Sequence, residues 1–177
     1  AQCRLGRLNE TGLGMRKNIV TAIKWYRSAA DKGDALAQYY LGMCYLRGKG
    51  VTKNKQLGIQ HIKNAADNQV PVAQCHLAYL HLFGDMVERD VSLALQYATQ
   101  AADGGVPDAQ FLLGILYEHG IGVTHDPDMA IKYYSAATNS GLPSAKFRLA
   151  LCYLRGEGVT EDREKAMQLF RDVVAGV

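Results

Sequence analysis

Apolar residues along the chain follow the spacing of amphipathic helices. Between residues 107 and 120 they stand at positions i, i+4, i+7 and i+8 of one helical face: Ala109, Leu113, Leu116 and Tyr117. After two glycines the helical spacing returns on a second segment, with Ala130, Tyr133, Tyr134 and Ala137 on one face. This pattern predicts two amphipathic helices joined by a short loop.

The two-helix pattern repeats every 36 residues over the whole chain. Three columns of identical residues carry the period: Ala1, Ala37, Ala73, Ala109 and Ala145; Leu5, Leu41, Leu77, Leu113 and Leu149; Gly12, Gly48, Gly84, Gly120 and Gly156. A period of this length is typical of helical repeat arrays. We therefore predict one array of five helix–turn–helix repeats, at residues 1–34, 35–70, 71–106, 107–142 and 143–177.

Glycines, prolines and capping residues mark the predicted helix ends. Gly120 and its four counterparts follow the first helix of each repeat, where Gly takes a left-handed conformation at little cost. Each second helix begins at a side chain that can cap free N–H groups: Asn18, Asn54, Asp90, Asp126 and Asp162. Every Pro stands at a predicted helix start. In repeat three Met86 replaces the second Gly of the loop, so we expect this loop to differ locally.

Small residues line the predicted contact between paired helices. Columns of Ala run along the second helices, and Gly6, Gly42 and Gly114 stand on the first helices. Small side chains let two helices approach closely, and large neighbours such as Tyr26 fill the space beside them. Because a single helix pair cannot bury its apolar face, the pairs must stack. The predicted fold is therefore all-α, a right-handed α/α superhelix (solenoid) of five 36-residue helix–turn–helix repeats.

The repeating phrase is Ala-x-x-x-Leu-Gly-x-x-Tyr-x-x-Gly-x-Gly-Val, then Asp, then Ala-x-x-Tyr-Tyr-x-x-Ala, most complete from Ala109 to Ala137. It resembles the Sel-one-like repeat (SLR) family, a relative of the tetratricopeptide repeat, over essentially the whole chain. The resemblance implies an adaptor or scaffold, because solenoid repeats mark a scaffold rather than a chemistry. A Cys-rich branch of the family has one disulfide per repeat and is associated with penicillin binding. This chain departs from that branch, because the corresponding positions are Ala pairs such as Ala30 and Ala37.

Composition and charge narrow the class of protein. Of 177 residues, 48% are hydrophobic and 21% are charged, as in globular rather than disordered chains. No apolar run reaches the roughly 18–20 residues of a membrane span, and a net charge of +3 is too small to indicate nucleic-acid binding. Repeats one and two each carry +4, repeats three and four −3 and repeat five +1. Either this uneven charge steers an oppositely charged partner to the chain, or it reflects ordinary sequence drift on solvent-exposed faces.

Candidate chemical groups are few. The four Cys fall in two pairs of equivalent positions, Cys3 with Cys75 and Cys44 with Cys152, which are too far apart for disulfides. We expect them to pack as small apolar residues. The five His form no metal-binding motif, and the Gly-x-Gly loops lack the preceding strand of a phosphate site. We predict a non-enzymatic protein with no catalytic residue, metal or cofactor.

The first helices carry the best candidate for a binding surface. If they line the concave face of the solenoid, the residues facing the groove are aromatic, apolar and basic, which are typical of binding hot spots. The predicted partner-binding residues are Tyr39, Met43, Arg47, Tyr79, Phe83, Phe111, Ile115, His119, Phe147 and Arg155. Leu46 and Cys75 fall on the same predicted face. We predict that this groove binds a protein or peptide segment, with the alternative that individual members only pack neighbouring helices together.

Other functions and settings stay open. Kinship with the Cys-rich branch would imply a penicillin-binding or hydrolase-type activity, and a purely structural spacer would need no binding surface. The chain starts without Met inside a predicted helix and ends without a polar cap. We interpret it as a piece of a longer array whose ends can associate end to end. Unpaired Cys favour a reducing compartment such as the cytoplasm, with the periplasm and the secretory pathway as alternatives.

Overall fold

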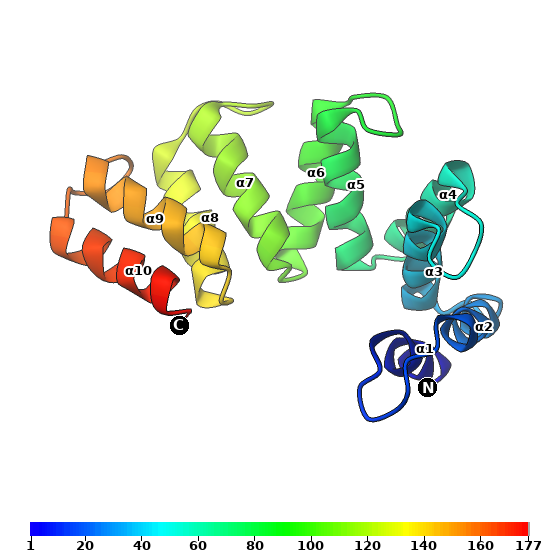
Figure 1. Cartoon of the computed structure of the whole chain (residues 1–177). Coiled ribbons are helices and arrows are strands. Elements are labelled where there is room, and N and C mark those ends of the chain that lie inside the picture. The colour runs from blue at the N-terminus through cyan, green and yellow to red at the C-terminus, as the bar shows by residue number, and fades with distance from the viewer. Residues whose placement is uncertain (177) are drawn as a thin grey trace. The chain divides into compact units, whose positions relative to one another are not determined.

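The structure, a computed structural model, describes residues 1–176. Over these residues the chain forms ten α-helices and no β-strand (Figure 1). The helices are α1 (Gln2–Thr11), α2 (Ile19–Ala30), α3 (Ala35–Arg47), α4 (Lys55–Asp67), α5 (Pro71–Phe83), α6 (Val91–Asp103), α7 (Pro107–His119), α8 (Pro127–Asn139), α9 (Pro143–Arg155) and α10 (Arg163–Ala175). Odd-numbered helices are the first helices of the repeats and even-numbered helices the second. The predicted all-α array of five helix–turn–helix repeats is confirmed.

The chain divides into two compact units, Ala1–Leu77 (unit one) and Ala78–Val177 (unit two). In unit one, α1 packs on α2, α2 on α3 and α3 on α4. In unit two, the same order of contacts runs from α6 through α10. In repeats one, two, four and five the second helix therefore packs against its own first helix, and α2, α6 and α8 also pack against the first helix of the next repeat.

The start of each second helix is fixed by two hydrogen bonds. The five predicted cap side chains each accept a hydrogen bond from the backbone N–H three residues ahead, at 2.9 or 3.0 Å. The backbone N–H of each cap donates back to a carbonyl of the first helix, as from Asp126 to Tyr117 at 3.0 Å. The five loops thereby keep one length and one path, which holds each repeat to 36 residues. The predicted caps and proline positions are confirmed.

The first glycine of each loop ends a helix, and the second allows a close contact between repeats. Gly48 and Gly120 close α3 and α7 with φ values of 67° and 64°, as expected for left-handed C-caps. A Cβ added at Gly122 would lie 2.6 Å from a methyl carbon of Val91, the first residue of α6 in the preceding repeat. A Cβ at Gly50 would lie 2.8 Å from Ile19 of α2 in the same way. The sequence pattern did not predict this second role.

The loop of repeat three keeps the left-handed backbone of the other loops although it lacks the second Gly. Met86 has a φ of 66°, against 73° at the equivalent Gly122. The Asp90 N–H donates to the His81 carbonyl at 2.9 Å, as in the other four repeats. Because this bond fixes the path of the loop, Met86 adopts a conformation that is unfavourable for a residue with a side chain. The expected local difference is therefore wrong for the backbone path.

Paired helices approach most closely where a Gly faces a large ring. A Cβ added at Gly6 or Gly114 would lie 2.4 Å from a ring carbon of Tyr26 or Tyr134 respectively. Both Tyr side chains are fully buried. The predicted close packing of small residues against large ones is thus confirmed.

The four Cys side chains are buried as thiols. Cys44 packs in the core cluster of unit one with Tyr26 and Leu41, and Cys152 packs in unit two with Tyr134 and Leu149. Burial raises the pKa of both Cys44 and Cys152 to about 11. The predicted packing role of these residues is confirmed, since such thiols are almost entirely protonated at neutral pH.

Candidate functional site

All ten predicted binding residues reach the surface of their unit. Five are half-buried: Tyr39, Met43, Tyr79, Phe111 and Ile115. Five are exposed: Arg47, Phe83, His119, Phe147 and Arg155. Exposure is largest among the apolar members at Phe83, with 69%, and Phe147, with 45%. These residues are therefore accessible within their own units.

Two further residues assigned to the same face are buried. Leu46 and Cys75 are each only 6% exposed. Leu46 fills the space over Gly58 of α4, where an added Cβ would lie 2.6 Å from a Leu46 methyl carbon. The prediction that they face the groove is wrong, because helical spacing alone does not show where the second helix makes its closest approach.

Several of the aromatic members also hold helices together. The Phe111 ring lies 5.8 Å from that of Tyr134, between ring centroids, and the Phe147 ring lies 5.4 Å from that of Phe170. The Tyr79 hydroxyl donates to the backbone carbonyl of Asp108 in the next repeat, at 3.3 Å. Aromatic members of the predicted surface thus carry part of the packing within unit two.

Unit one brings three of the predicted residues together in a pocket of about 130 Å³, at the junction of repeats one and two. We call it the α1–α3 pocket; its lining is Glu10, Tyr39, Tyr40, Met43, Cys44, Arg47 and Lys49. Most α3 side chains on one wall are apolar or aromatic, whereas the end of α3, the end of α1 and the loop after α3 supply the charges of Arg47, Glu10 and Lys49. A hydrophobic wall with a few placed charges is typical of a recognition site.

Glu10 is the centre of a polar network in this pocket. Its carboxylate accepts a hydrogen bond from the Tyr26 hydroxyl at 2.6 Å and from the Lys49 ammonium at 2.7 Å. Burial alone would raise the pKa of Glu10, but the hydrogen bonds from Lys49 and Tyr26 hold it below its ordinary value. Burial, and then the hydrogen bond to Glu10, raises the pKa of Tyr26. The network therefore contains a carboxylate, a neutral phenol and an ammonium at neutral pH.

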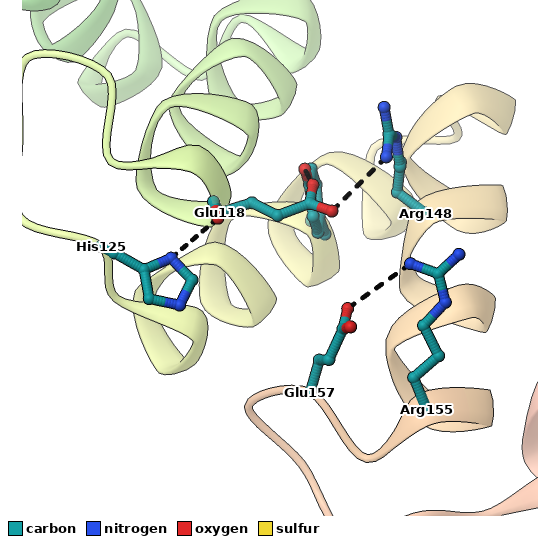
Figure 2. A network of polar contacts seen from close by, with 6 residues as sticks. Glu118, His125, Arg148, Arg155 and Glu157 are labelled. Atoms are coloured by element: carbon teal, nitrogen blue, oxygen red, sulfur yellow. Dashed lines mark hydrogen bonds and ion pairs between the residues drawn. The ribbon is translucent and has the colours of Figure 1, made fainter.

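Unit two has a related pocket of about 260 Å³ at the junction of repeats four and five. We call it the α7–α9 pocket; its lining is Glu118, His119, His125, Pro127, Ala130, Cys152, Arg155 and Glu157. Figure 2 shows Arg148 directed at the Glu118 carboxylate, with 3.4 Å between nitrogen and oxygen, and Arg155 beside Glu157 at 3.8 Å. The Tyr134 hydroxyl donates to the Glu118 carboxylate from α8.

His125 faces the same pocket in a defined tautomer. Its Nδ1 lies 2.8 Å from the backbone carbonyl of Glu118 (Figure 2). Because a carbonyl oxygen can only accept, Nδ1 carries the hydrogen, and Nε2 of the neutral ring is a hydrogen-bond acceptor. Among residues 1–176, however, no group of three or more His, Cys, Asp or Glu side chains is arranged to hold a metal ion.

The two pockets are copies of one another, 108 residues apart in the sequence. Three pairs of lining residues are identical: Glu10 with Glu118, Cys44 with Cys152, and Arg47 with Arg155. The buried partners Tyr26 and Tyr134 are a fourth pair. The pockets differ in charge at two positions, since Lys49 corresponds to Glu157 and Tyr40 corresponds to Arg148.

Sequence reasoning missed both glutamates, although a signal was present. The other three members of their column are apolar: Leu46, Leu82 and Leu154. A carboxylate in an otherwise apolar column needs polar partners when it is buried. Searching the equivalent repeats for those partners would have pointed to Tyr26 and Tyr134.

Comparison with known proteins identifies the repeats. The family model described as Sel1 repeat matches residues 1–34, 35–70, 71–106, 107–142 and 143–171. Over 47 residues the chain is 43% identical to a sel1-like repeat-containing protein of Acanthamoeba polyphaga mimivirus; the match covers 27% of this chain and 9% of the viral protein. Separately, within the described residues, no helix has the length and apolar character needed to cross a membrane.

Solved structures agree with the family match. A Sel1 repeat protein from Oxalobacter formigenes is 32% identical with a TM-score of 0.87, over 98% of this chain and 69% of that one. A protective antigen of uropathogenic Escherichia coli with an SLR fold is 29% identical with a TM-score of 0.85, over 98% of this chain and 37% of the antigen. The family model matches all five repeats and the fold agrees with that of solved Sel1 repeat structures, so the chain belongs to the Sel1 repeat family.

Proposed function

We propose that the chain is a non-enzymatic scaffold that binds a segment of a partner protein on the surface of its first helices. Sel1 repeat proteins are generally non-enzymatic scaffolds that mediate protein interactions. The observation that supports the binding surface is the ring pair at the end of α5, where Phe83 is 69% exposed and stacks on Tyr79 with 6.2 Å between centroids. A partner that covers these rings gains apolar burial and aromatic contacts at once.

Polar groups at the position of Phe83 in other repeats would add specificity. His119 and Arg155 occupy the position of Phe83 in repeats four and five, and both are exposed. Each charge placed next to an apolar contact restricts which side chains a partner can present there. We therefore expect a partner segment with apolar residues spaced among polar ones.

Selection of peptides on the immobilised chain tests this proposal. Peptides selected from a random phage-displayed library are measured by fluorescence anisotropy against the wild type and a Phe83→Ala/Phe147→Ala variant. Phe83 is 69% exposed, whereas Phe147 also packs on Phe170, so circular dichroism first checks that the variant is folded. The loss of two aromatic contacts weakens binding about tenfold or more. A Lys132→Ala/Asn139→Ala variant of exposed residues on α8 is the matched control and binds as the wild type.

Two results would contradict the proposal. Unchanged affinities in the Phe83→Ala/Phe147→Ala variant would place binding elsewhere on the chain. A library that yields no binding peptide would favour a structural spacer.

A further inference from the structure

Arg47 is exposed, and its charge acts on the fold only without direct contact, as where it helps to lower the pKa of Glu10. Among residues 1–176 its guanidinium has no hydrogen-bond or ion-pair partner, although it lines the α1–α3 pocket. Its counterpart in unit two is different, because Arg155 lies 3.8 Å from the Glu157 carboxylate (Figure 2). The same repeat position thus holds an Arg with a carboxylate in one pocket and an Arg without one in the other.

Two changes of charge separate the pockets: Lys49 corresponds to Glu157 in the loop after the first helix, and Tyr40 corresponds to Arg148, which pairs with Glu118. The Lys49 ammonium is directed at Glu10 at 2.7 Å. Glu10 is therefore already neutralised by Lys49 and hydrogen-bonded by Tyr26. With Arg47, Lys49 and Glu10 charged, the pocket keeps one uncompensated positive charge.

The surroundings of the pocket reinforce this charge. Repeats one and two each carry a net charge of +4, although the whole chain carries only +3. A basic surface around a basic pocket raises the local concentration of anionic groups and speeds their association. An anionic group is therefore the ligand that the electrostatics favour.

The aromatic side chains of the pocket favour an apolar group next to the anion. The Tyr39 and Tyr40 rings meet edge to face with 5.4 Å between centroids, and Tyr40 stacks on buried Tyr26 at 5.3 Å. Arg7 lies over the Tyr40 ring at 5.4 Å and holds it from another side. A volume of about 130 Å³ is smaller than the roughly 300–1,000 Å³ of small-molecule sites. It suits one side chain of a larger partner.

We propose that the α1–α3 pocket binds a carboxylate of the partner segment, with Arg47 as its ion-pairing group and Tyr39, Tyr40 and Met43 against an adjoining apolar residue. The partner's carboxylate takes the place beside Arg47 that Glu157 takes beside Arg155. An Arg guanidinium suits this role because it can form two parallel hydrogen bonds to one carboxylate. This inference rests on the proposed function and names the chemistry of one of its contacts.

Short peptides of defined composition test the inference directly. The first probe is N-acetyl-Ala-Leu-Glu-Leu-amide, the second replaces Glu by Gln, and the third is the Gln peptide with a free C-terminal carboxylate. Binding is followed by NMR shifts of the Tyr39 and Met43 backbone N–H groups and of the Arg47 Nε–H. At least one carboxylate peptide is expected to bind about tenfold more tightly than the Gln amide. The first and third probes distinguish a side-chain carboxylate from a chain terminus.

Matched variants assign the preference to Arg47. Arg47→Met abolishes the preference for a carboxylate, and Arg171→Met, at an exposed Arg of α10 outside the predicted binding surface, leaves it intact. Lys49→Glu restores an internal carboxylate beside Arg47 and weakens binding of the carboxylate peptide. Equal binding of all three probes, or a preference that survives Arg47→Met, would overturn the inference. The proposed function would then still be judged separately by the Phe83 and Phe147 variants, which lie in unit two.

Discussion

At the residue scale, two residues that face each other on the paired helices of a repeat are complementary in size. Gly114 faces Tyr134 in repeat four, whereas Ala78 and Ala98, both fully buried, occupy the equivalent positions in repeat three. A large ring on the second helix therefore occurs where the facing residue of the first helix is Gly. The absence of a Cβ at Gly114 is a packing requirement, since this residue lies inside α7 where Gly is unfavourable for the helix.

We expect Gly114→Ala to destabilise the protein by about 1–3 kcal/mol, because the new Cβ would lie 2.4 Å from a Tyr134 ring carbon. In a Tyr134→Ala background the same substitution should be neutral or stabilising, by up to about 1 kcal/mol, since Ala is the better helix former. Urea unfolding of the four proteins completes the double-mutant cycle. An equal penalty in both backgrounds would show that the ring is not the cause.

The turn between repeats two and three has a residue that its backbone does not favour. Gln69 is exposed with a φ of 57°, whereas the equivalent Gly141 has a φ of 82°. We expect Gln69→Gly to stabilise the protein by about 0.5–1 kcal/mol, because relief of the left-handed strain outweighs the greater freedom of Gly in the unfolded chain.

The reverse change is the control for the Gln69 variant. A Cβ added at Gly141 meets nothing within 4 Å, so Gly141→Gln isolates the backbone effect and should destabilise by a similar amount. Urea midpoints of both variants at constant slope measure the two effects. A destabilised Gln69→Gly variant would mean that the Gln side chain contributes more than its backbone costs.

At the scale of elements, the Glu10 network ties the end of α1 to α2 and to the loop after α3. Because the pKa of Glu10 is held below its ordinary value, its contribution to stability is complete above the ordinary carboxyl pKa. That contribution is lost as the pH falls through the lower pKa of the folded state. We expect Glu10→Gln to be less stable than the wild type at pH 7, with the difference shrinking as the pH falls below the ordinary carboxyl pKa of about 4.5.

Chemical unfolding of unit one, followed by the fluorescence of Trp25, measures this difference at each pH. The control is Asp67→Asn in the same unit, because Asp67 is exposed and its carboxylate has no hydrogen-bond or ion-pair partner among residues 1–176. It should change the free energy of unfolding little at any pH. A constant gap between wild type and Glu10→Gln from pH 7 to about pH 3 would contradict the assignment of the effect to the carboxylate.

Helix boundaries were predictable from the sequence, because they are set by residues close to each helix end. The Asn and Asp caps, the prolines and the first glycine of each loop act within one turn of the chain, so their positions alone indicate the helices. The second glycine and Glu10 were not predictable in this way. Gly122 meets Val91 of the preceding repeat, and Glu10 meets Lys49 of the next. Such contacts depend on how consecutive repeats pack, which one repeat does not contain.

At the scale of the whole molecule, contacts in the chain are made between neighbouring elements within each of its two units. In such an array, stability is approximately a sum of the repeats and their nearest-neighbour interfaces. The predicted binding surface is also built repeat by repeat, because each column of equivalent positions contributes one residue per repeat. The columns place the residues at the surface, but only the contacts within a unit show which of them form a pocket.

Matched core substitutions test whether stability is local in this sense. We expect Tyr26→Ala to raise hydrogen-exchange rates in α1, α2 and α3 by about 100-fold or more, since loss of a buried ring costs several kcal/mol. Rates in α8, α9 and α10 should stay as in the wild type. Tyr134→Ala, at the equivalent position of repeat four and equally buried, should produce the reverse pattern. Exchange followed by mass spectrometry resolves the two regions, and a uniform rise along the chain in either variant would show that the five repeats unfold as one cooperative body.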